Sequence, residues 1–174
     1  IRRQRQMCIR DSMKTITKDQ IFKLDQRVGE VCKAKYNEGM EEYRKNRSRI
    51  KCLKSKKDRK MEIIKCFKAI TIAACTTPRS SKIVCEQNGP PPNICMFKQE
   101  IKEIEKMRKD CKMPKPKNKF GRCAEQRGAN TLIQSFSSKV SLDDIFFSVA
   151  LRPRTSQVVE YCENCCYLFK TLRT

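Results

Sequence analysis

Residues 76–92 read TTPRSSKIVCEQNGPPP and join two segments that have the apolar spacing of helices. In the segments 57–75 and 93–111, apolar residues recur every three or four positions, which is typical of amphipathic helices. The connector cannot continue either helix, because its prolines lack the N–H that a helix interior needs. The pattern predicts a helical core whose cysteines, at or near the segment ends, form disulfides. These are Cys52, Cys66, Cys75, Cys85, Cys95 and Cys111.

The regions on either side of this core also have helical patterns. Thr17 and Gln20 fit a capping box, and the apolar residues that follow predict a long helix reaching about residue 46. Ser141 stands where it can cap a further helix, and apolar residues between 158 and 172 recur at helical spacing. The sequence therefore predicts an all-α fold: a small disulfide-stapled helical bundle of about four to five helices with long irregular connectors.

The chain has twelve cysteines among its 174 residues and no histidine. Its other apolar residues are few, so cross-links are expected to support a thin core. This cysteine density indicates disulfides in an oxidising compartment, or a metal site. Zinc would need cysteine ligands alone, and Cys162-x-x-Cys165-Cys166 lacks a second CxxC at a useful distance, so we expect no metal and no cofactor. The disulfide candidates are Cys32, Cys52, Cys66, Cys75, Cys85, Cys95, Cys111, Cys123, Cys162, Cys165 and Cys166.

Residues 2–12, RRQRQMCIRDS, match the translation of a sequencing-library adapter. We therefore expect residues 1–12 to be non-native; the alternative is a basic arm that binds nucleic acid. Without their four arginines and one aspartate the net charge falls from +21 to +18, and the eleven remaining cysteines leave an odd one that could link two chains. Residues 13–123 are expected to form a lysine-rich, disulfide-linked helical domain. Residues 124–174 would be a less basic helical appendage, or sequence read past the true coding end.

The net charge of +21 exceeds what solubility requires and predicts an anionic partner. That partner could be a glycan, an acidic protein, a lipid surface or a nucleic acid, and charge alone does not choose among them. Two basic stretches are the candidate contact sites, each with a solvated bend or linker as the alternative; Phe120 in the second suggests stacking on a base or sugar. The anion-binding candidates are Lys54, Lys56, Lys57, Arg59 and Lys60 in the first stretch, and Lys112, Lys115, Lys117, Lys119 and Arg122 in the second.

The sequence offers little for catalysis, since histidine is absent and its five glycines form no phosphate-binding loop. We expect a secreted, non-enzymatic binding protein that engages an anionic macromolecule through its lysine-rich faces. Asn46, in Asn46-Arg47-Ser48, is a glycosylation candidate compatible with secretion. One alternative is a membrane-active, saposin-like or toxin-like protein. Another is a basic structural subunit of a nucleoprotein or organellar assembly, in a mitochondrial or other organellar compartment.

Overall fold

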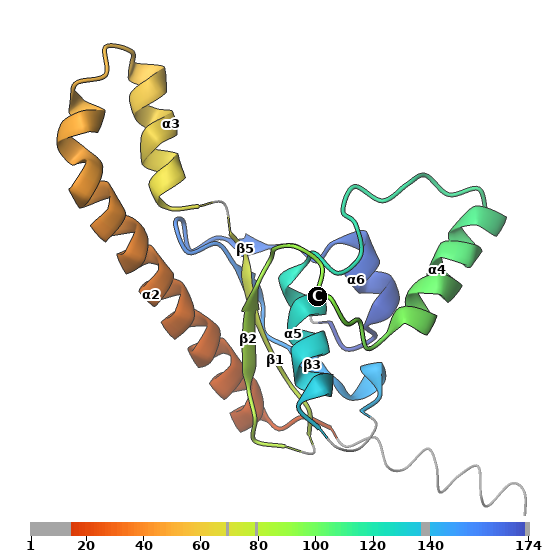
Figure 1. Ribbon diagram of the computed structural model, residues 1–174. Helices are drawn as coiled ribbons and strands as arrows, with labels where there is room; N and C mark the ends of the chain where they lie inside the picture. The colour runs from red at the N-terminus through yellow and green to blue at the C-terminus, as the bar shows by residue number, and fades with distance from the viewer. Residues whose placement is uncertain (1–14, 69, 79, 137–139, 173–174) are drawn as a thin grey trace, which may run out of the picture.

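The computed structural model describes residues 15–68, 70–78, 80–136 and 140–172, so the segment 1–12 lies outside the described residues. Within them the fold is mixed α/β, with five α-helices and a five-stranded antiparallel sheet (Figure 1). The all-α prediction is therefore wrong. The helices are α2 (Lys18–Lys51), α3 (Lys56–Cys66), α4 (Lys98–Asp110), α5 (Ala124–Gln134) and α6 (Glu163–Leu168), with a 3₁₀ turn η1 (Leu142–Asp144). The strands are β1 (Ile72–Thr76), β2 (Val84–Gln87), β3 (Phe146–Phe147), β4 (Ala150–Leu151) and β5 (Val158–Val159).

Helix α2 begins at the predicted capping box. The Thr17 hydroxyl accepts a hydrogen bond from the Gln20 N–H at 3.2 Å, and the Gln20 side-chain oxygen accepts one from the Thr17 N–H at 3.0 Å. The first half of α2 buries Leu24, Val28 and Cys32 against the sheet. Its second half extends well beyond the sheet (Figure 1).

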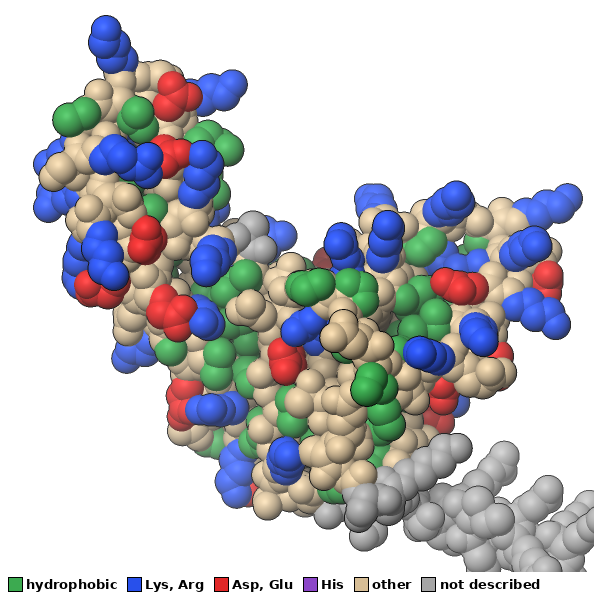
Figure 2. Space-filling model, viewed as in Figure 1, with side chains coloured by type: hydrophobic (Ala, Val, Ile, Leu, Met, Phe, Trp, Pro, Cys, Tyr) green, Lys and Arg blue, Asp and Glu red, His purple; other side chains and the backbone are tan. Residues whose placement is uncertain are grey.

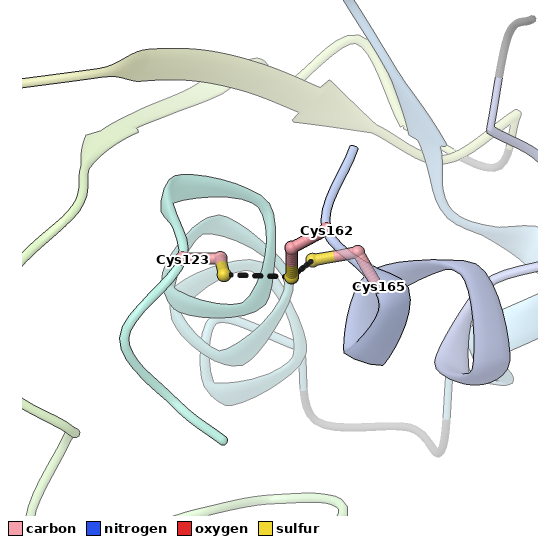
Figure 3. Close-up of side chains that lie close together, drawn as sticks. All are labelled: Cys123, Cys162 and Cys165. Carbon is pink, nitrogen blue, oxygen red and sulfur yellow. Dashed lines mark hydrogen bonds between the residues drawn. The ribbon is translucent and has the colours of Figure 1, made fainter. Parts of the chain in front are cut away.

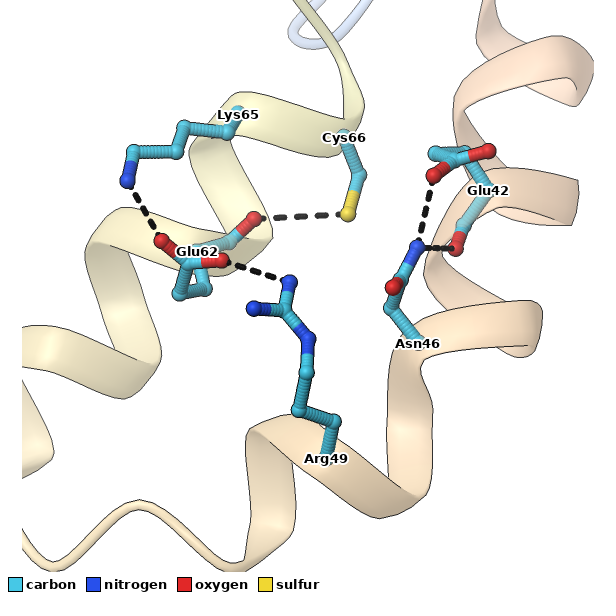
Figure 4. Close-up of polar contacts among 6 residues, drawn as sticks. All are labelled: Glu42, Asn46, Arg49, Glu62, Lys65 and Cys66. Atoms are coloured by element: carbon cyan, nitrogen blue, oxygen red, sulfur yellow. Dashed lines mark hydrogen bonds and ion pairs between the residues drawn. The ribbon is translucent and has the colours of Figure 1, made fainter.

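Helix α3 folds back along the distal half of α2, and the two form a helical hairpin. Phe67, directly after α3, packs on Tyr36 with ring centroids 5.5 Å apart, and it lies over Gly39 of α2. Arg49 of α2 and Glu62 of α3 form an ion pair at 2.8 Å across the hairpin (Figure 4). The hairpin is therefore joined by a small apolar contact and a surface ion pair.

The segment 57–75, predicted as one helix, is divided between two kinds of structure. Helix α3 ends at Cys66, and β1 occupies the centre of the sheet, whose strand order is β2-β1-β4-β5 with β3 also paired to β1. The predicted irregular connector contributes β2, which pairs antiparallel to β1 with Ala74 opposite Cys85. In the segment 93–111 the predicted helix is present but shorter: α4 begins at Lys98, and residues 93–97 form bends and turns.

Strand β1 has the sequence pattern of a helix because both of its faces are covered. All five of its residues are buried, so the run ITIAACT at 70–76 has no polar alternation to mark a strand. Ile72 and Ala74 pack in a cluster with α2, while Ala73 and Cys75 pack in clusters with α5. Figure 1 shows α2 and α5 on opposite sides of the sheet.

In the C-terminal region, predicted as helical, the structure has three short strands, and of the helical pattern between 158 and 172 only α6 is a helix. Ser141 caps only η1, and β3 and β4 then pair with β1 in registers that differ by one residue, which makes a β-bulge. Ser148 occupies the bulge: its hydroxyl accepts from the Ala74 N–H and its own N–H donates to the Ala74 carbonyl, both at 2.9 Å. Aromatic and β-branched residues in this region suit short strands as well as helix faces.

No disulfide joins any of the eleven described cysteines, so the prediction of a disulfide-stapled, disulfide-rich fold is wrong. The core is apolar and aromatic. Phe97, Phe147 and Phe169 are fully buried, and the Phe169 ring lies 6.3 Å and 4.7 Å from the other two, centroid to centroid. These rings come from segments far apart in sequence, so the composition understated the interior they make together. No described helix is long and apolar enough to cross a membrane.

Candidate functional site

Basic side chains crowd the turn between α2 and α3, at the far end of the hairpin (Figure 2). Five of the predicted anion-binding residues lie here; four are exposed and Arg59 is half-buried. Within the described chain, none of the five forms an ion pair. We call them the hairpin-tip patch: Lys54, Lys56, Lys57, Arg59 and Lys60.

The cations along the shaft of α2 differ from this patch, because acids on the same helix neutralise several of them. Lys23 pairs with Asp19 at 2.7 Å, and Lys35 pairs with Glu38 at 2.8 Å. Such exposed pairs add little to stability, but they cancel the local field. All five cations of the hairpin-tip patch, by contrast, lack an ion-pair partner among the described residues.

The second predicted group lies in the loop between α4 and α5. Its five cations are all exposed, and none forms an ion pair within the described residues. The loop starts at Lys112, which follows the end of α4 and has a φ of 52°, in the left-handed region. We call this group the loop patch: Lys112, Lys115, Lys117, Lys119 and Arg122.

Two other side chains of this region have roles that the sequence did not indicate. Phe120 is half-buried and packs against the aromatic core, so it is turned away from any base or sugar. Arg108 of α4 is buried; it pairs with Glu163 at 2.7 Å, lies 4.9 Å above the Tyr167 ring and donates to the Pro114 carbonyl at 3.1 Å. It thereby fixes the start of the loop to α6.

The structure places the two patches on separate projections. The hairpin forms one, and α4 with its following loop forms the other, with the sheet between their bases (Figure 1). Figure 2 shows the surface hollowed between these two basic projections. A partner that touches both patches must therefore be broad enough to span the hollow.

Asn46, the glycosylation candidate, lies within the continuous helix α2. Its side-chain amide donates to the Glu42 carbonyl at 2.9 Å and to the Glu42 carboxylate at 2.6 Å (Figure 4). The nitrogen that would carry a glycan is thus held by two acceptors.

Cys123 meets the two cysteines of the CxxC motif, Cys162 and Cys165, where the N-termini of α5 and α6 lie together (Figure 3). Cys123 is the N-cap of α5, Cys162 is the N-cap of α6, and Cys165 lies in the first turn of α6. The sulfur of Cys162 is 3.0 Å from that of Cys123 and 3.4 Å from that of Cys165, and all three lie within 4.8 Å of one another. We call these three residues the sulfur cluster.

The surroundings of the sulfur cluster perturb its thiols. Hydrogen bonds with Cys123 and Cys165 lower the pKa of Cys162. Hydrogen bonds with Cys123 and Cys162, together with its own burial, raise the pKa of Cys165. Glu125, in the first turn of α5, is buried, which raises the pKa of its carboxyl; its Oε2 lies 3.7 Å from the Cys165 sulfur. Gln126 Nε2 lies 3.4 Å from the same sulfur.

A cavity of about 560 Å³ lies beside the sulfur cluster. Cys123 and Cys162 form part of its wall, which also carries two arginines, Arg122 and Arg152, and two glutamates, Glu125 and Glu160. The loop patch therefore touches this cavity through Arg122.

The remaining cysteines are outside the cluster: Cys32, Cys52, Cys66, Cys75, Cys85, Cys95, Cys111 and Cys166.

The sulfur cluster could not be found from the sequence, because its third member is far from the CxxC motif. Cys123 precedes Cys162 by 39 residues, and the packing of α5 beside α6 brings it close. The motif itself was the available signal, but nothing local identified its partner. The chain is thus a mixed α/β protein with two basic projections and a three-thiol cluster; no protein-family model, curated protein or solved structure matches it.

Proposed function

We propose that this is a non-enzymatic, polyanion-binding protein whose partner is a nucleic-acid duplex held by its phosphates. The observation that carries the proposal is that the ten cations of the hairpin-tip and loop patches have no carboxylate partner among the described residues. Cations that are already paired attract a polyanion weakly. Unpaired ones steer it to the surface and release its counterions on binding.

Two features favour a duplex over a sulfated glycan or a single strand. The patches lie on separate projections, so contact with both requires charge spread over a broad surface (Figure 2). Neither patch contains an exposed aromatic ring of its own: Phe120 packs inward, and Tyr167, which is 40% exposed beside Met113 of the loop, has the Arg108 guanidinium over its ring. Phosphate contacts need only exposed cations, which both patches supply.

The other functions considered lose part of their basis. Secretion was expected because disulfides were expected, and the described cysteines form none, so a secreted protein that binds an acidic glycan, an acidic protein or an anionic surface loses that support. A saposin-like protein would open an all-helical fold, whereas here a sheet lies at the centre. A nucleic-acid partner agrees with the alternative prediction, which was a basic structural subunit of a nucleoprotein or organellar assembly.

The test is the salt dependence of binding to a short random-sequence duplex, measured by fluorescence anisotropy. With Lys54, Lys56, Lys57 and Lys60 all changed to Gln, four phosphate contacts are lost. The slope of log K against log salt should then become shallower by about 3–4, because each neutralised phosphate contributes about 0.9. Circular dichroism confirms that the variant is folded.

A matched variant changes Lys23, Arg27, Lys35 and Arg44 to Gln, four cations that form ion pairs on α2. It removes the same formal charge but should change the slope far less. Equal changes in both variants would show that only net charge matters and contradict the assignment to the patches. Retention of heparin without duplex binding would favour the glycan alternative, and dye release from anionic vesicles would favour the membrane-active one.

A further inference from the structure

The sulfur cluster has the dimensions of a metal site. Zinc is held by cysteine sulfurs at about 2.3 Å in a tetrahedron, so paired sulfurs in such a site are about 3.8 Å apart. The separations here are 3.0 Å and 3.4 Å, with the third pair also within 4.8 Å. Rotamer adjustments of less than about 1 Å would bring the sulfurs to that geometry. We propose that Cys123, Cys162 and Cys165 bind one thiophilic divalent ion, Zn²⁺, with Glu125 as the fourth ligand.

Glu125 is in position to complete the tetrahedron. Its Oε2 lies 3.7 Å from the Cys165 sulfur, and about 3.5 Å is expected between an oxygen and a sulfur that share one zinc ion. Its side chain is only 5% exposed, and it forms no ion pair within the described residues. A buried carboxylate without a cation is costly, and a bound dication removes that cost.

Gln126 provides a second contact of the kind that supports metal ligands. The Gly121 N–H donates to the Gln126 side-chain oxygen, so the amide group is oriented with its nitrogen toward Cys165. That nitrogen lies 3.4 Å from the sulfur and is a donor only, which suits a thiolate acceptor. Donors placed behind a ligand in this way fix its orientation in metal sites.

Binding would replace the three S–H protons, which pass to solvent, with three Zn–S bonds and one Zn–O bond. Three thiolates and one carboxylate around a dication carry a net charge of −2. Arg122, Arg152 and Glu160 line the neighbouring cavity, so its other charged side chains sum to +1 and offset part of that charge. Because the four ligands come from α5 and from the start of α6, the ion would join the C-terminal helix to the helix that covers the sheet.

The test is titration of the reduced protein with Co²⁺ under anaerobic conditions, followed by displacement with Zn²⁺. One equivalent should bind, with a thiolate-to-cobalt charge-transfer band whose intensity corresponds to three sulfur ligands. Cys123→Ser, Cys162→Ser and Cys165→Ser should each lose about a third of that intensity and bind Zn²⁺ at least about tenfold more weakly. Glu125→Gln should keep the band but lower the affinity; unchanged affinity would overturn the assignment of Glu125.

Cys166→Ser is the matched control, because Cys166 lies next to Cys165 but is exposed and outside the cluster. It should leave both the band and the affinity unchanged, and an effect as large as that of Cys165→Ser would overturn the three-sulfur assignment. Since Cys165→Ser could unfold the protein, alkylation of the unmodified chain gives a second readout. Zn²⁺ should protect all three sulfurs of the cluster; their full alkylation with Zn²⁺ present, or a native Cys123–Cys162 disulfide, would overturn the proposal.

Discussion

Gly128 lies where α5 packs against β1. A Cβ placed there would be 3.1 Å from the sulfur of Cys75, which is fully buried in the core. The sulfur cannot retreat without displacing its neighbours, so Gly128→Ala should overpack the interface. We expect the free energy of unfolding to fall by about 1–3 kcal/mol, measured by urea denaturation.

Gly29→Ala is the control for this change, because Gly29 is also in a helix but a Cβ added there would meet nothing within 4 Å. It should stabilise the protein by about 0.5–1 kcal/mol, the usual gain of alanine over glycine in an exposed helix. Combining Gly128→Ala with Cys75→Ala should cost less than the two changes added together. Additive costs would show that the methyl and the sulfur do not meet.

At the scale of residues, the sequence indicated which side chains are exposed but not which side chains they contact. The ten patch cations lie at or near the surface as predicted, because lysine and arginine are rarely buried. Arg108 is the exception, and its burial depends on Glu163 and Tyr167, which lie more than fifty positions along the chain. Phe120 shows the same contrast: its neighbours in sequence suggested a stacking surface, and its neighbours in space are core side chains.

At the scale of elements, the α2–α3 hairpin depends on Gly39. A Cβ at this position would lie 2.5 Å from Cδ1 of Phe67, so Gly39→Ala should push Phe67 out and loosen α3 from α2. Amide exchange in α3 should become faster, while exchange in β1 stays unchanged. Because the hairpin-tip patch connects these helices, duplex binding should also weaken.

The smaller side chain of Phe67→Leu should restore slow exchange in α3 when it is combined with Gly39→Ala. Faster exchange in every element would instead mean that the hairpin and the sheet unfold as one unit. Slow exchange in α3 with Gly39→Ala alone would contradict the proposed contact.

The same scale shows why some elements could be predicted and others could not. Helix α2 carries its own signals, a capping box and a one-sided apolar face, so it could be recognised locally. Strand β1 is covered by α2 on one face and α5 on the other, and burial on both faces removes the alternation that marks a strand. Its identity depends on segments that lie before and after it in the chain.

At the scale of the whole molecule, the error about disulfides came from composition. A thin core was inferred from composition, and cross-links were invoked to support it. Strands from the C-terminal region instead complete the sheet, with Leu151 opposite Ile72. This long-range pairing brings aromatic side chains together in the core. Composition gives the number of apolar residues but does not show how many of them pack into one core.

The excess of positive charge should make salt act in opposite directions on stability and on binding. The net charge of +21 remains after every acidic residue has been counted, so the native state is opposed by repulsion between its own cations. Raising the salt concentration shortens the range of this repulsion from about 30 Å at 0.01 M to about 10 Å at 0.1 M. The melting temperature measured by circular dichroism should therefore rise with salt while duplex affinity falls; a gain of about 1 kcal/mol corresponds to about 2–4 °C for a chain of this size. The four-glutamine variant of the hairpin-tip patch should melt higher at low salt and respond less to added salt, and a melting temperature that falls with salt in both proteins would contradict self-repulsion.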